Sequence, residues 1–226
     1  MRLVAAGFVV ALGLLASSAS AATNECRGIQ SCIRVPGPWV LVPAHGTAQF
    51  LLSCPNGRSV VGGLDAQATS RDVRVGFDGR LGAPVSPGVT TTRYALFRAV
   101  STSARPQVFQ PLLGCIPTQG GGGRSTVSAR TVTPVGPALE LRSRIVIIGP
   151  GQLKSAKVSC LASEKLVGSW QATAFRVKQP PTIGSGSLVQ VSRTSSGKQV
   201  VVTATATDGL SIDVHAIVQV GAVCAP

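Results

Sequence analysis

Few residues in this sequence are suited to acid–base or nucleophilic chemistry. There are two histidines, His45 and His215, and eight acidic residues among 226. No serine lies in a G-x-S-x-G sequence, the turn that presents the nucleophile in many hydrolases. No two carboxylates are marked by their spacing as the pair that a glycosidase needs. We therefore assign no catalytic residue and expect both histidines to face solvent.

The six cysteines are the other reactive residues. The C-x2-C spacing typical of zinc sites is absent, and two histidines add few further ligands. Cysteines of an exported chain commonly form disulfides. We therefore predict structural disulfides, and neither a metal site nor a cofactor site.

The sequence contains an internal duplication. A constant offset of 106 residues aligns residues 40–68 with residues 146–174 without a gap, and seven of these 29 positions are identical. Both copies contain the pattern C-x5-[VL]-V-G, which begins at Cys54 and at Cys160, and each half ends in a further cysteine. A repeat of this kind predicts two units of the same architecture.

The duplication selects one disulfide pattern from the 15 that six cysteines allow. The two repeated cysteines of each half should pair with each other. The two cysteines that have no counterpart in the second half should form the remaining pair. A lobe of this size has a marginal core, so such disulfides contribute much of its stability. The predicted pairs are Cys54–Cys115, Cys160–Cys224 and Cys26–Cys32.

Alternating apolar residues predict an antiparallel β structure in both halves. We expect an all-β fold of two tandem, duplicated β-sandwich-like lobes, each with about six strands and a disulfide. Residues 22–117 form the first lobe, residues 118–131 a glycine-rich linker and residues 132–226 the second lobe. The predicted strands are 39–42, 59–68, 72–77, 92–100 and 107–115 in the first half, and 144–148, 165–175, 187–193, 198–207 and 211–224 in the second, besides those that lead into Cys54 and Cys160.

The last of these strands has the clearest pattern. Alternate residues from Ile212 to Cys224 are apolar, which predicts one buried face, and His215 and Gln219 lie on the opposite face. Asp208-Gly209 precedes the strand, and this dipeptide favours a tight hairpin with residues 199–207.

The N-terminus has the pattern of an export signal. One basic residue, Arg2, precedes an apolar run, and small residues follow up to Ala22. We expect a signal peptide over residues 1–21, a secreted or envelope-associated location, and no transmembrane segment in the mature chain.

Net positive charge is the strongest physical feature of the composition. The formal net charge is +13, although only 13% of the residues are charged. Such a charge attracts anionic polymers at long range, whereas the few aromatic residues argue against specific nucleic-acid recognition. The residues that we expect to contact a polyanion are Arg71, Arg74, Arg80, Lys154, Lys157 and Lys165.

One motif supports these inferences. Residues 54–63, CPNGRSVVGG, resemble a C-P-x-G-x-x-V-V-G-G motif of secreted β domains in uncharacterised bacterial proteins. The resemblance implies export and a disulfide, and it carries no activity, cofactor or catalytic residue. The second half keeps only the cysteine and the [VL]-V-G part.

We therefore expect a non-enzymatic binding protein at the cell envelope or outside it, whose ligand is an anionic polymer or another surface protein. Three alternatives remain open. One is a structural subunit that assembles through strand edges, and another is a hydrolase with an unmarked acidic site. The third is a protease inhibitor that presents a loop such as residues 80–92 or 179–187.

Overall fold

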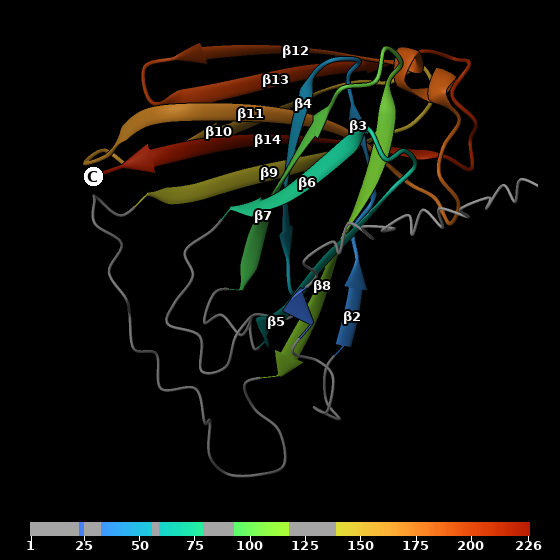
Figure 1. Ribbon diagram of the computed structural model, residues 1–226. Helices are drawn as coiled ribbons and strands as arrows, with labels where there is room; N and C mark the ends of the chain where they lie inside the picture. The colour runs from blue at the N-terminus through green and yellow to red at the C-terminus, as the bar shows by residue number, and fades with distance from the viewer. Residues whose placement is uncertain (1–22, 25–32, 56–58, 79–92, 118–138) are drawn as a thin grey trace, which may run out of the picture.

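The computed structural model describes residues 23–24, 33–55, 59–78, 93–117 and 139–226 (Figure 1). This part of the chain is built of strands, with one short 3-10 helix, η1 (Ile183–Leu188). The predicted all-β class is confirmed. The proposed signal peptide and the linker over residues 118–131 lie outside the described residues.

The first half contains two antiparallel sheets. Strands β5, β8 and β3 belong to an eight-stranded sheet, with β1 on the outer side of β5 and β2 beside β8, and β4, β7 and β6 form a separate sheet. The strands are β1 (Thr23–Asn24), β2 (Ile33–Pro36), β3 (Trp39–Val42), β4 (Thr47–Ser53), β5 (Ser59–Ala68), β6 (Val73–Asp78), β7 (Tyr94–Ser101) and β8 (Gln107–Pro117).

The second half repeats this arrangement. Strands β11, β14 and β9 continue the eight-stranded sheet, and β10, β13 and β12 form a third sheet. The strands are β9 (Glu140–Ile148), β10 (Leu153–Ser159), β11 (Lys165–Arg176), β12 (Val189–Ser196), β13 (Gln199–Ala206) and β14 (His215–Ala225).

The strand orders of the two halves correspond one to one. The order β5-β8-β3 matches β11-β14-β9, and β4-β7-β6 matches β10-β13-β12. The 106-residue offset places β10 on β4 from its first residue to its last. In the first half, β2 and β3 pair one after the other along β8, as the single strand β9 does along β14.

The halves meet at strand edges that are not equivalent. Strand β3 of the first half pairs with β11 of the second through Val40↔Ala174 and Trp39↔Phe175. In Figure 1 the second-half strands cross the upper part of the view, and most first-half strands run at a steep angle to them and extend further down. We call this contact, with the packing around it, the junction.

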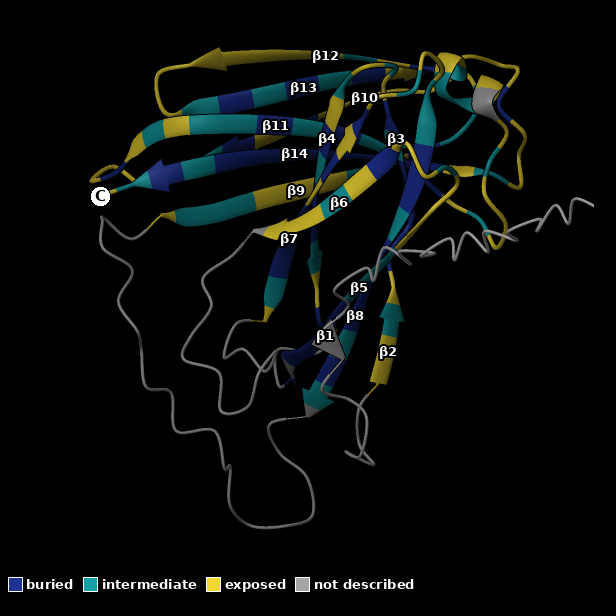
Figure 2. Cartoon of the chain, in the orientation of Figure 1, coloured by how far each residue is buried: buried dark blue, intermediate teal, exposed yellow. Residues whose placement is uncertain are grey.

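The junction also shares the hydrophobic core. Ala172, Ala174 and Ile217 of the second half belong to the core cluster of the first half. Strand β14 is consequently buried on both faces from Ala216 to Ala222, as the dark central strand in Figure 2 shows. Burial of apolar surface on both sides of one strand makes the two halves mutually dependent.

One buried amide connects the halves by hydrogen bonds. Gln219 Nε2 donates to the carbonyl oxygen of Leu51 at 2.9 Å, and Gln219 Oε1 accepts from the Leu51 N–H at 2.7 Å. Trp170 Nε1 also donates to Gln219 Oε1, at 3.3 Å. The indole of Trp170 packs directly against Gly221, where an added Cβ would meet the ring at 2.0 Å.

Both disulfides predicted from the duplication are confirmed. Cys54 is bonded to Cys115 and Cys160 to Cys224. All four cysteines are buried in the cores of their own halves. The third predicted pair, Cys26–Cys32, lies outside the described residues.

Three predictions about the C-terminal region are wrong. Strand β14 begins at His215 rather than at residue 211, and Ile212 is 80% exposed in a turn. The segment at Asp208-Gly209 is no tight hairpin, because β13 pairs with β10 and β12 in another sheet. The predicted polar face of β14 is also wrong at Gln219, which is fully buried because the first half covers it.

Equivalent turns in the two halves give a stability test. His45 and Gly151, which the offset aligns, follow β3 and β9 and adopt φ of 47° and 65°. A residue with a Cβ is strained in this region, whereas glycine is not. Relief of this strain, about 1–2 kcal/mol, exceeds the loss of about 0.4–1 kcal/mol that arises because glycine makes the unfolded chain freer. His45→Gly is therefore expected to raise the free energy of unfolding by about 0.5–1 kcal/mol.

Gly151→Ala is the opposite change at the equivalent turn. Its new Cβ would lie 2.5 Å from Asp208 Oδ1, so we expect a loss of stability in denaturant unfolding. A stabilising Gly151→Ala substitution, or a destabilising His45→Gly substitution, would contradict the assignment of strain to this turn.

Candidate functional site

A hollow lies where β11 and the β2–β3 segment separate. Beyond the pair Trp39↔Phe175, continued pairing would bring Pro38 and Pro36 opposite β11. Proline has no N–H to donate to a ladder, so the pairing ends there. The space between the diverging chains has a volume of about 710 Å³.

Three basic side chains line this hollow. Arg34 comes from β2, Arg176 ends β11, and Lys178 follows two residues later, and all three are exposed. Among the described residues that line it there is no carboxylate. We call this feature the basic pocket; its other lining residues are Pro36, Gly37, Gln110, Leu112 and Val177.

Gln110 holds one wall of the basic pocket in place. Its Nε2 donates to the carbonyl oxygen of Gly37 at 2.8 Å, and its Oε1 accepts from Gln67 Nε2 at 2.5 Å. The Gly37 N–H donates in turn to the carbonyl oxygen of Pro111 at 2.8 Å. A Cβ on Gly37 would lie 2.7 Å from the Pro111 ring, so the close approach of these chains requires glycine.

The cations predicted to contact a polyanion do not gather in this pocket. Arg71 lies next to β6, and Arg74 lines a different hollow on β6 and β7, together with Arg98. Lys154 and Lys157 lie on β10 and Lys165 begins β11, and all five predicted cations within the described residues are exposed. Arg80 lies outside the described residues.

Sequence reasoning missed the cations of the basic pocket. The spacing of Arg176 and Lys178 places two cations on one side of an extended segment, and this signal was available. Arg34 is far away in the sequence and gave no such signal. Only the pairing of β3 with β11 brings it to the other two.

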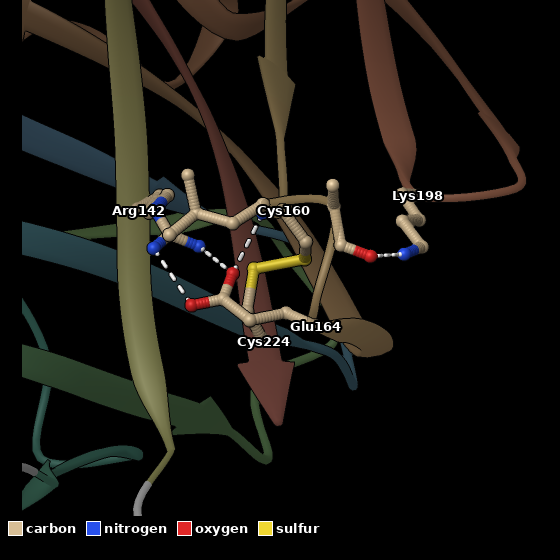
Figure 3. The surroundings of a disulfide bond; sticks show 7 residues. Arg142, Cys160, Glu164, Lys198 and Cys224 are labelled. Atoms are coloured by element: carbon tan, nitrogen blue, oxygen red, sulfur yellow. Dashed lines mark hydrogen bonds and ion pairs between the residues drawn. A yellow bond between two sulfur atoms is a disulfide. The ribbon is translucent and has the colours of Figure 1, made fainter. Parts of the chain in front are cut away.

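The Cys160–Cys224 disulfide has an ordered polar neighbourhood (Figure 3). Arg142 Nη2 donates to Glu164 Oε1 at 2.8 Å, Arg142 Nη1 bonds Glu164 Oε2, and the Leu161 N–H donates to Oε2 at 2.7 Å. The Arg142 guanidinium, helped by the Leu161 N–H, holds the pKa of the Glu164 carboxyl below its ordinary value of 4.5.

This neighbourhood does not suit a metal ion. Ligand atoms of Cys160, Glu164 and Cys224 lie within 4.8 Å of one another. However, both sulfurs are joined in the disulfide, and the carboxylate is bound by Arg142. A metal-binding cysteine must be a thiolate, so this group is a structural one.

The histidines and one proposed inhibitory loop are also placed by the structure. His45 and His215 are both exposed, as expected. Within residues 179–187, η1 begins at Ile183, and Gly186 lies close to the Leu41 side chain. This segment has no arginine or lysine at its tip. The other proposed loop, residues 80–92, lies outside the described residues.

Comparisons of the chain with protein-family models, with curated proteins and with solved structures found no match. Within the described residues there is no helix long and apolar enough to cross a membrane.

Proposed function

We propose that this protein is a secreted or envelope-associated binding protein whose basic pocket takes an anionic polymer. The observation that carries the proposal is the convergence of Arg34, Arg176 and Lys178 from both halves on one hollow without a described carboxylate. The export pattern of residues 1–21 and the two buried disulfides support a location outside the cytoplasm.

The chemistry of the pocket favours phosphate or carboxylate groups. Two guanidinium groups present forked donors that match the oxygens of such anions, and Lys178 adds a point charge. Because Arg34 and Arg176 approach the hollow from opposite walls, consecutive anionic groups of one chain can contact both. The net charge of +13 adds long-range attraction that weakens with salt.

The test separates the pocket from the overall charge. The variant Arg34→Gln/Arg176→Gln/Lys178→Gln is compared with the control Arg93→Gln/Arg105→Gln/Arg144→Gln, which removes the same charge from exposed positions outside the pocket that are not among the predicted polyanion contacts. The probe is a polyphosphate chain, measured by fluorescence anisotropy at low and moderate salt. We expect the pocket variant to lose about tenfold or more in affinity, since each hydrogen bond to a charged group contributes about 1.5–3 kcal/mol, and the control to lose much less.

Equal losses in the two variants would overturn the proposal, because the attraction would then belong to the net charge alone. Cosedimentation of the same proteins with envelope fragments extends the test to natural polymers. Binding to fragments that persists in the pocket variant at moderate salt would also contradict the proposed site.

A further inference from the structure

The junction has a geometric consequence for self-association. It joins the edge of β3 to the edge of β11. The equivalent of β3 in the second half is β9, and the equivalent of β11 in the first half is β5. A contact between two unlike edges is heterologous, and repetition of such a contact builds open chains of subunits. Each molecule therefore carries one further edge of each kind, at β9 and at β5.

Both of these edges are largely uncovered within the described residues. Strand β9 pairs only with β14, and β5 is covered on its outer side only at Gly63 and Leu64, by β1. At the junction itself the β11 contact is made by Ala174 and Phe175, whose equivalents on β5 are residues 68 and 69. Among the described strands, β1 covers only Gly63 and Leu64 and none covers the relevant end of β5.

Residues that are buried at the junction have exposed equivalents at the edges of β9 and β5. Trp39 is 5% exposed at the junction, whereas Ile145, its equivalent on β9, is 46% exposed. Ala174 is fully buried, whereas Ala68, its equivalent on β5, is exposed. The edge of β9 therefore exposes an apolar residue at a position equivalent to one on β3, and the second half covers the β3 position at the junction.

Two lysines distinguish the β9 side from its first-half counterpart. Lys154 takes the place of Ala48, and its Nζ donates to the carbonyl oxygen of Ile147, a main-chain acceptor of β9, at 2.7 Å. Lys157 takes the place of Leu51, which at the junction is buried in a cluster with Trp170. Lysine is a residue that natural edge strands use to prevent pairing with other chains.

We propose that the β9 edge fits the β5 edge of a second copy of this chain in the geometry of the junction, and that Lys154 and Lys157 keep it closed. Docking would bury the Lys157 ammonium where Leu51 lies at the junction and would displace Lys154 from Ile147. Burying an unpaired ammonium is costly. The lysines thus limit the continuous sheet to the two halves of one molecule. They prevent the open-ended assembly of molecules that a structural subunit would use.

The experiment removes both lysines. Lys154→Ala/Lys157→Leu restores the residues found at the junction, and Arg105→Leu/Lys165→Ala is a control with the same change of charge and a similar gain of apolar surface. Sedimentation velocity over a wide range of protein concentration is the measurement. We expect the double lysine variant to form species that grow with concentration beyond the dimer, while the wild type and the control sediment as monomers.

A third variant shows whether the association uses the β5 edge. Ala68→Lys, added to the double lysine variant, places a charge on the exposed β5 position that would meet β9, so we expect it to restore the monomer. Monomeric behaviour of the double lysine variant would overturn the proposal. Association that survives Ala68→Lys, or association of the wild type that Ala68→Lys abolishes, would overturn it as well.

Discussion

Replacing Gln219 with leucine is expected to lower the free energy of unfolding by about 2–5 kcal/mol, because buried polar groups lose their partners. The substitution removes the acceptor of the Leu51 N–H, the donor to the Leu51 carbonyl and the acceptor of Trp170 Nε1. Leucine has a similar volume, so the loss reports mainly on hydrogen bonds. Urea denaturation followed by tryptophan fluorescence measures it.

The duplication supplies a matched control for this substitution. Gln110 is the equivalent of Gln219, since each lies five residues before the second cysteine of its half. Its side chain is only half-buried, and water can replace its bonds to Gln67 and Gly37. We expect Gln110→Leu to cost less than about 1 kcal/mol. A similar cost for both substitutions would contradict the role of Gln219 in the junction.

The sequence predicted the features that depend on local order. Strands β3 and β5 begin and end at the predicted residues, because alternation and turn residues mark their ends. The pairing of Cys54 with Cys115 and of Cys160 with Cys224 followed from the 106-residue offset and from the further cysteine that ends each half. Both features are repeated in the chain, so each half supported the inference drawn from the other.

The sequence did not predict the features that arise where the halves meet. Gln219 belongs to the polar phase of its strand and was expected to face solvent, but its partner Leu51 is 168 residues away. The basic pocket has the same origin, because Arg34 meets Arg176 only through the pairing of β3 with β11. Neither contact has a counterpart within one half, so the duplication carried no information about it.

This origin ties the proposed function to the integrity of the junction. One wall of the basic pocket belongs to the first half, around Gly37, and the other is the end of β11. A substitution that weakens the junction therefore acts on the binding site from a distance, without removing any of its cations. The two halves are consequently expected to bind as one unit rather than as two independent modules.

Removal of the Cys160–Cys224 disulfide tests whether the halves also unfold as one unit. The bond closes a loop with a sequence separation of 64 residues. In the chain-entropy treatment a loop of this length contributes about 4 kcal/mol. We expect Cys160→Ala/Cys224→Ala to lower the denaturant midpoint by a corresponding amount. The decisive measurement is the number of transitions, followed by tryptophan fluorescence and by circular dichroism.

We expect a single transition in this variant, because the destabilised half supplies Ala172, Ala174 and Ile217 to the core of the other half. Once β11 and β14 unfold, these residues leave the first core and the Gln219–Leu51 bonds are broken. The first half would then expose apolar surface that it cannot cover alone. Two separated transitions, in which the first half stays folded after the second half has unfolded, would contradict this expectation. They would show that the junction couples the halves less strongly than its shared core indicates. Cys54→Ala/Cys115→Ala is the matched variant, and it should give the same single transition from the other side of the junction.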